Sequence, residues 1–218
     1  MRLWSALLIV VIAACSRSEQ EPKPQPPKTS AISERALSSS HPDPNITVEE
    51  VKKRLREPRE DYLYNTISWL IIRRDDPQIM ELLKTVWARD KSGYPDLAWS
   101  ELGSPVVRVA LAQTLAQVYP KNQSYKAYIL KALDDRDPFV QSRAALALGV
   151  LGDPTDIPKL ETMVRAADKH ASEMAIVALA SMRRSDANAA LERLKKEFAA
   201  DVAKVQAIEK HLSIFRDR

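Results

Sequence analysis

Cysteine and histidine are the residues best suited to nucleophilic or metal chemistry, and this chain has few of them. Cys15 is the single cysteine among 218 residues, so no disulfide can form within the chain. Histidine occurs at His41, His170 and His211. His170 and Glu173 stand three residues apart, a spacing that would place both side chains on one helix face as an acid–base or metal pair. One such pair is common by chance, and we expect this one to belong to a solvated surface.

Motifs of the common enzyme classes are missing from the sequence. It contains no Gly-rich phosphate loop, no Gly-x-Ser-x-Gly nucleophile elbow and no His-Glu-x-x-His zinc helix. We therefore expect a non-enzymatic protein without a metal or a cofactor. An enzyme or small-ligand module is the alternative, and it would need a pocket with convergent polar or titratable groups.

The segment before Cys15 has the design of a secretory signal peptide. Arg2 supplies a positive start, residues 3–12 are apolar apart from one serine, and two alanines precede the cysteine. This apolar stretch is too short to span a bilayer, which needs about 20 residues. The longest later apolar run, 67–72, contains a serine and is followed by two arginines. We therefore expect no transmembrane helix in the mature chain.

The residues Ile12-Ala13-Ala14-Cys15 resemble the lipobox of bacterial lipoproteins. The resemblance implies that residues 1–14 are cleaved off and that Cys15 is the lipid-attachment site and the new N-terminus. Lipidation would also remove an unpaired, oxidisable thiol from a secreted protein; an ordinary signal peptide followed by an incidental cysteine is the alternative. Ser16, where inner-membrane lipoproteins carry aspartate, implies an outer-membrane anchor that faces the periplasm. The outer face of the plasma membrane is the other possible location.

Residues 15–46 form a Pro- and Ser-rich segment with almost no apolar periodicity. Such a composition cannot bury enough surface to offset the entropy of the chain, so the sequence predicts a disordered tether.

The net charge of the whole chain says little about its partners. The 33 Lys and Arg residues exceed the 29 Asp and Glu residues by only four, and this surplus is spread along the chain. This surplus is a weak signal for nucleic acid, and we expect no nucleic-acid partner.

From residue 47 onward the pattern becomes helical. Thr47 and Glu50 have the spacing of a capping box. Three further helix starts place a side-chain acceptor directly before a proline, at Asp76-Pro77, Ser104-Pro105 and Asp137-Pro138. Apolar residues recur between them at three- and four-residue spacing, and no convincing alternating strand is present. The sequence predicts an all-α domain over 47–218.

The helical part repeats itself. Leu115, Leu148 and Leu179 come into register at offsets of 33 and 31, and Leu160 and Leu191 stand 31 apart in the helices that follow. This indicates two helices per repeat. The best repeats are 104–134, 137–167 and 168–198, with polar capping helices expected near 47–56 and 201–216.

The repeat that begins at Asp137 resembles the HEAT-like repeats of the phycobilisome-lyase type. The matching positions are Asp137, Pro138, Val140, Ala144, Ala145, Ala147, Leu148, Gly149, Leu151, Gly152, Asp153 and Pro158. Gln141 departs from the arginine usual in the family, while Arg108 keeps it in the preceding repeat. The resemblance implies a right-handed α-solenoid of antiparallel helix pairs and says little about function. Apart from the family, the three alanines should let neighbouring helices approach, and the two glycines should loosen and end the helix.

Two regions are candidate partner-binding surfaces. The segment 91–103 interrupts the repeat register and carries Tyr94 and Trp99, residue types favoured as interface anchors. The second helices carry charged residues at equivalent repeat positions and should point them away from the core. These residues are Glu161, Arg165, Glu192 and Lys196. A merely solvated face explains this pattern equally well.

The lipobox, the tether and the repeats together favour a membrane-tethered, non-enzymatic scaffold that binds another protein of the cell envelope. An envelope enzyme or cofactor-binding module of the lyase-like type is one alternative. A passive structural spacer is another, and it would tolerate charge reversal across the second helices.

Overall fold

The computed structural model describes residues 44–165 and 168–216, with side chains up to Ser213. Cys15, the predicted signal peptide and all but the last three residues of the predicted tether lie outside these residues. Within the described ranges the regular elements are α-helices and two 3-10 turns, without a strand. None of the described helices is long and apolar enough to cross a membrane.

Helix pairs make up most of the fold. The first helices of the pairs are α3 (Glu60–Trp69), which the 3-10 turn η1 (Leu70–Arg73) extends, α6 (Pro105–Val118), α8 (Pro138–Leu151) and α10 (Lys169–Ser181). The second helices are α4 (Pro77–Ala88), α7 (Gln123–Ala132), α9 (Ile157–Val164), which follows the turn η2 (Pro154–Asp156), and α11 (Ser185–Glu197). The remaining helices are α2 (Val48–Leu55), α5 (Trp99–Leu102) and α12 (Val202–Arg216).

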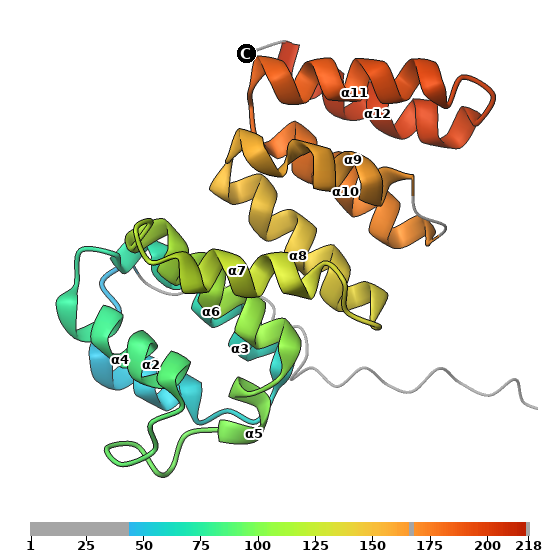
Figure 1. Ribbon diagram of the computed structural model, residues 1–218. Helices are drawn as coiled ribbons and strands as arrows, with labels where there is room; N and C mark the ends of the chain where they lie inside the picture. Colours follow the sequence, from blue (N-terminus) through green and yellow to red (C-terminus); the bar gives the residue numbers. More distant parts are fainter. Residues whose placement is uncertain (1–43, 166–167, 217–218) are drawn as a thin grey trace, which may run out of the picture. The chain divides into compact units, whose positions relative to one another are not determined.

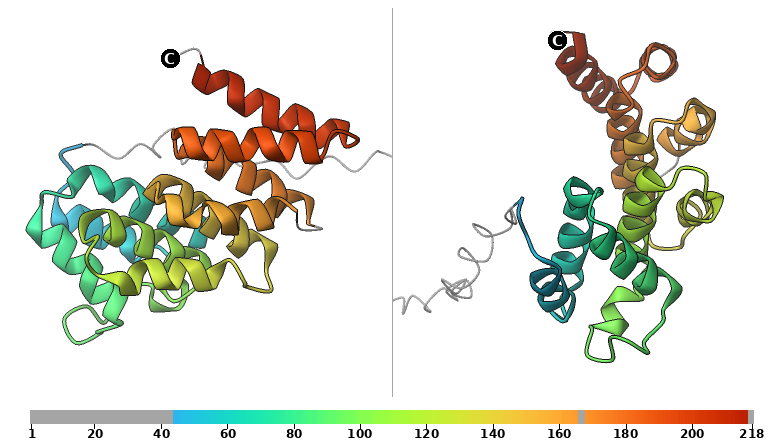
Figure 2. Two further views of the ribbon diagram at one scale, coloured as in Figure 1. Left: turned by 45° about the horizontal axis from the view of Figure 1, so that its top comes forward. Right: turned by 90° about the vertical axis from the view of Figure 1, so that its left-hand side faces the viewer.

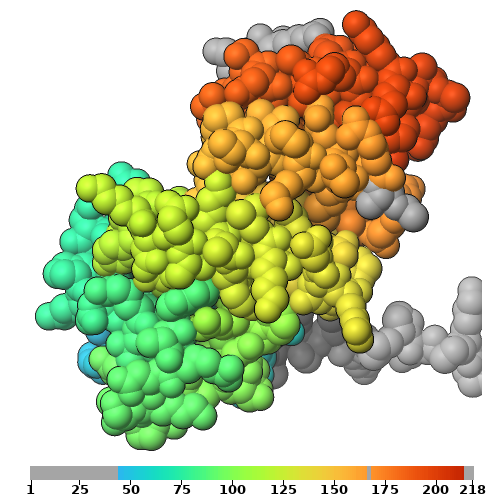
Figure 3. All heavy atoms as spheres, viewed as in Figure 1, coloured from blue at the N-terminus to red at the C-terminus, as the bar shows by residue number. Residues whose placement is uncertain are grey.

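The first helices stack on one another in chain order, from α3 to α6, α8 and α10, and the last helix, α12, packs on α10 (Figure 1). The second helices pack beside this column, so α7 contacts α6 and α8, and α11 contacts α10 and α12. Two turned views show the same column (Figure 2). The space-filling view shows the chain in successive bands of colour, because each pair mainly contacts its neighbours (Figure 3). The expected all-α solenoid of HEAT-like helix pairs is confirmed.

Helix starts lie where the sequence predicts them. Asp76, Ser104 and Asp137 each accept a backbone N–H at the start of their helix, and each is followed by proline. A proline at the first helical position sacrifices no hydrogen bond there. Thr47 Oγ1 accepts the N–H of Glu50 at 3.3 Å, as a capping residue does. The Glu50 carboxylate lies 3.4 Å from Arg54 Nε and is thus engaged along helix α2.

The two glycines of α8 have different roles, and one prediction about them is wrong. Gly152 ends the helix with a left-handed backbone, φ 67°, as expected. Gly149 does not loosen the helix. A Cβ there would lie 2.6 Å from the carbonyl oxygen of Ala178 and 2.7 Å from its Cα, so α8 and α10 are in backbone contact at this point. The missing side chain allows the backbones of these two repeats to approach closely.

Both ends of the described fold are tied to the column. Arg73 Nη1 donates to the Ile46 carbonyl and, at 3.4 Å, to that of Pro44, and Arg73 also pairs with Asp76 at 2.7 Å. Ile46 is buried, so the chain enters the core before α2 begins. At the other end, Ile208 of α12 is fully buried against the last helices. Helices α2 and α12 thus occupy the two positions where capping helices are expected.

Candidate interaction surfaces

Charged side chains of α9 and α11 pair across adjacent repeats. Arg165 donates from Nε and Nη2 to the two carboxylate oxygens of Glu197, at 2.8 and 2.7 Å. Arg193 Nη2 donates to Glu161 Oε1 at 2.8 Å. The hydrogen bonds with Glu197 raise the pKa of Arg165, and those with Arg165 lower the pKa of Glu197. We call these four residues the charged ladder.

The charged ladder contains half of the charged residues that the sequence singles out. Glu161 and Arg165 belong to it, whereas Glu192, half-buried, and Lys196, exposed, are not among its members. Alignment of the repeats within the chain did not identify the other two members, Arg193 and Glu197, which directly follow Glu192 and Lys196. One signal was available: the sign pattern reverses from Glu161–Arg165 to Arg193–Glu197 at the same four-residue spacing. An acid followed by a base on one repeat can therefore form two ion pairs with a base followed by an acid on the next.

The segment 91–103 folds back against α2. Ala98 N donates to the Leu55 carbonyl at 3.0 Å, and Arg56 pairs with Asp96. Trp99 is only 8% exposed, and its Nε1 donates to the Tyr94 carbonyl at 2.8 Å. Trp99 is therefore a core residue that holds the segment and, although the sequence makes it a candidate partner-binding residue, it presents little surface to a partner. Tyr94 is half-buried beside Lys52, whose Nζ lies 5.4 Å from the ring centroid.

An aromatic cluster joins α4, α6 and α7. The Trp87 ring meets those of Tyr125 and Tyr128 edge to face, with centroids 5.2 and 5.4 Å apart. The Arg108 guanidinium carbon lies 3.9 Å from the Trp87 centroid, and Nη1 donates to the Trp87 carbonyl at 2.7 Å. Burial lowers the pKa of Arg108 and raises that of Tyr128. The arginine shared with the HEAT-like family thus connects two repeats.

His170 and Glu173 do not form a pair. His170 is exposed at the start of α10, while the Glu173 carboxylate lies 3.9 Å from Lys169 Nζ. Burial, with a smaller contribution from Lys210, lowers the pKa of His211 in α12. In residues 44–165 and 168–216 no group of three or more His, Cys, Asp or Glu side chains could hold a metal ion.

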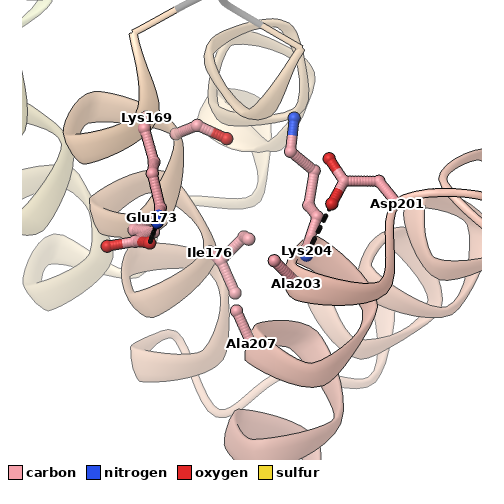
Figure 4. Close-up of a pocket in the computed structure, with 8 residues that line it drawn as sticks. Lys169, Glu173, Ile176, Asp201, Ala203, Lys204 and Ala207 are labelled. Atoms are coloured by element: carbon pink, nitrogen blue, oxygen red, sulfur yellow. Dashed lines mark hydrogen bonds and ion pairs between the residues drawn. The ribbon is translucent and has the colours of Figure 1, made fainter. Parts of the chain in front are cut away.

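A hollow of about 320 Å³ lies between α10 and α12. Ile176 of α10 faces Ala203 and Ala207 of α12 across it (Figure 4). The charged groups that line this hollow form hydrogen bonds or ion pairs within the protein. Lys204 Nζ donates to the Val164 carbonyl at 3.1 Å, and Asp201 accepts the Lys204 N–H at 3.0 Å. The hollow is best explained as a packing gap that small alanines leave beneath the last helix.

A second hollow, of about 370 Å³, lies where α6 and α8 end and α7 begins. We call it the α6–α8 hollow. Lys126 on its wall pairs with Asp153 and lies 3.0 Å from Asp156 Oδ2, an ion pair without hydrogen-bond geometry. Lys126 and Thr155 hold the pKa of Asp153 at about 2, while burial raises that of Asp156. Burial opposes the charge of Lys126, but the two carboxylates outweigh it and raise its pKa.

Comparison with known families agrees with this geometry. Residues 97–180 match the family model of HEAT repeats. The match begins in the 91–103 segment, covers the pairs α6–α7 and α8–α9, and ends within α10. No curated protein and no solved structure matches the chain. HEAT repeats are helical modules that commonly hold other proteins, so the match indicates a protein-interaction scaffold.

Proposed function

We propose that this chain is a lipid-anchored, non-enzymatic scaffold of the bacterial cell envelope, whose HEAT repeats hold another envelope protein. The stack of helix pairs that matches the HEAT family carries the proposal. In such a stack each added repeat extends one continuous surface, so contact area grows without any catalytic group. The charged ladder of α9 and α11, in which Arg165, Arg193 and Glu197 are exposed and Glu161 is half-buried, gives that surface a defined charge pattern.

The anchor is proposed from the lipobox resemblance at Cys15. One acyl chain binds a membrane only marginally, whereas the two or three chains of a mature lipoprotein hold durably. Ser16 favours the outer membrane, with the repeats facing the periplasm. Fractionation of cells that express wild-type chain or Cys15→Ala tests this. We expect the wild type in the outer-membrane fraction and the variant either released or retained as precursor; a variant that fractionates like the wild type contradicts the anchor.

Site-specific photocrosslinking in the native host tests the scaffold. A benzophenone amino acid at the exposed Lys196 of α11 reports on the second helices, and the same group at the exposed Asn65 of α3 is the matched control. We expect one dominant envelope-protein crosslink from position 196 that is weaker from position 65. If neither position captures a protein beyond those captured by a Cys15-anchored chain without repeats, the scaffold proposal fails and a passive spacer is favoured.

The charged ladder allows a sharper form of this experiment. Reversing Glu161 alone breaks its bond to Arg193, so a lost crosslink could reflect a disturbed repeat. The swap Glu161→Arg with Arg193→Glu restores an opposite-charge pair within the chain but inverts the pattern presented to a partner. We expect the swap to unfold like the wild type in urea and to lose the crosslink. Normal capture by the swap would show that the partner does not contact the charged ladder.

A further inference from the structure

The walls of the α6–α8 hollow combine a small apolar patch with polar groups. Ile71 of η1, Ala116 of α6 and the last two residues of α8, Val150 and Leu151, supply the patch. Val150 is 52% exposed, which is unusual for a valine in a helical stack. The polar residues of the wall are Arg74, Gln117, Asn122, Gln123, Lys126 and Asp153. Such a mixed wall suits a ligand with one aliphatic group and one polar end.

Arg74 is the cation of this wall whose guanidinium forms no ion pair with the described residues. Its neighbour Arg73 is engaged by the Ile46 carbonyl and by Asp76. Lys126 is held by Asp153 and Asp156. Among the residues that the structure describes, none supplies an acceptor or a carboxylate to the Arg74 guanidinium, which is exposed at the rim of the hollow. A guanidinium is a planar, two-pronged donor that matches a carboxylate.

Arg74 is the main source of positive potential at the hollow. The other cation of the wall, Lys126, is already balanced by the carboxylates of Asp153 and Asp156. Helix α7 begins at Gln123 in this wall, but α6 and α8 end beside it, so the helix dipoles add no net positive potential. A negative group at the hollow would therefore be attracted by Arg74 itself.

We infer that the α6–α8 hollow binds the C-terminal carboxylate of a partner polypeptide whose last side chain is aliphatic. The carboxylate pairs with Arg74, the aliphatic side chain covers Val150, and the Gln117 amide is placed to bond the last peptide group. The apolar patch is formed by four residues, which suits one aliphatic side chain. This inference rests on the scaffold function proposed above and names the chemistry by which the scaffold would recognise its partner.

Titration of the full-length chain with N-acetyl-glycyl-leucine, followed by NMR, tests the inference. We expect shifts in the backbone signals of Arg74, Gln117 and Val150 that saturate at millimolar peptide. The C-terminal amide of the same peptide should bind about tenfold more weakly, because it lacks the charge that Arg74 pairs with. Equal binding of acid and amide, or shifts that lie away from the hollow, would overturn the inference.

Isovalerate provides a control for the source of the carboxylate. It carries the carboxylate and the branched aliphatic group without a peptide bond. Binding at least tenfold weaker than that of the peptide supports a polypeptide terminus. Binding of equal strength overturns it in favour of a small-acid site.

Two substitutions separate recognition from folding. Arg74→Gln should reduce binding of the acid to the level of the amide, whereas Arg136→Gln, which removes the same charge at the opposite ends of α7 and α8, should leave binding unchanged. Val150→Glu should abolish binding by placing a carboxylate in the patch. Each variant should keep the dispersed spectrum of the folded chain. A folded Arg74→Gln or Val150→Glu variant that binds like the wild type contradicts the inference.

The photocrosslinking experiment remains independent of this titration. A crosslink from position 196 that persists in Arg74→Gln, together with a negative titration, would leave the scaffold intact and reject only the hollow as its peptide site. Loss of all crosslinks in wild-type cells would reject the scaffold itself.

Discussion

At the residue scale, Gly149 is the position where a single added carbon has the largest expected effect. In Gly149→Ala the new Cβ meets backbone atoms of Ala178, which cannot rotate away. Overpacking costs about 1–3 kcal/mol, which exceeds the gain of about 1 kcal/mol from replacing glycine in a helix. The middle of the overpacking range less this gain predicts that the free energy of unfolding in urea falls by about 1 kcal/mol.

Gly93→Ala is the matched control for this substitution. A Cβ at Gly93 would have no atom within 4 Å, and its backbone does not require glycine. Its stability should stay within about 0.5 kcal/mol of the wild type. Equal effects of the two substitutions would show that α8 and α10 are not in backbone contact at Gly149.

Arg108 is the second residue whose chemistry, rather than charge alone, is expected to matter. Lysine keeps the charge but lacks the planar guanidinium that lies against the Trp87 ring and 5.6 Å from the centroid of the Tyr128 ring. Arg108→Lys should therefore cost about 1–2 kcal/mol in urea unfolding and should alter the near-ultraviolet signal of Trp87. Arg136→Lys, at an exposed position, should change neither quantity.

At the element scale, Asp153 couples the end of α8, the turn η2 and the start of α7. Its pKa in the folded protein, about 2, lies below the ordinary value of 3.8. An acid of this kind stabilises the fold above the unfolded pKa, and the contribution is lost as pH falls from about 4 to about 2. We expect Asp153→Asn to cost about 1 kcal/mol at pH 6, after discounting for the partly exposed carboxylate, and almost nothing near pH 2.

The buried Asp156 should show the opposite dependence. Burial raises its pKa, so its charge opposes folding above the unfolded pKa and this penalty is relieved as the pH falls. Asp156→Asn should therefore be neutral or stabilising at pH 6, measured by the same urea titration. Asp134→Asn, on the exposed turn after α7, is the control for removal of one surface acid. Parallel pH profiles for all three variants would contradict the assigned roles.

The elements themselves were largely predictable, because their starts depend on local chemistry. The Asp-Pro and Ser-Pro signals place the beginnings of α4, α6 and α8 at their observed residues. Contacts between distant residues were not predictable from one sequence. The burial of Trp99 depends on a return of the chain to α2, and the partners of Glu161 and Arg165 lie one position beyond the equivalent residues of the next repeat. Register between repeats is set by packing, which repeat spacing alone does not determine.

At the scale of the whole molecule, the stack of pairs predicts that damage stays local. Ile208→Ala removes a fully buried side chain of α12 and should cost about 3 kcal/mol. Because each repeat contacts mainly its neighbours, hydrogen exchange should accelerate in α10–α12 while α3 and α4 keep their protection. Uniform acceleration along the chain would show instead that residues 44–216 unfold as one cooperative unit.

The hydrogen bonds of Arg73 determine how a pulling force on the N-terminal side would reach the stacked helices. The carbonyls of Pro44 and Ile46 are bound by a side chain of η1, at the end of the first helix of the column, rather than by α2 alone. A pulling force applied ahead of residue 44 would therefore reach the stacked helices through Arg73 and Asp76 before α2 is peeled away. When the chain is held at one end and pulled at the other, the hydrogen bonds of Arg73 should therefore break before the stacked helices separate.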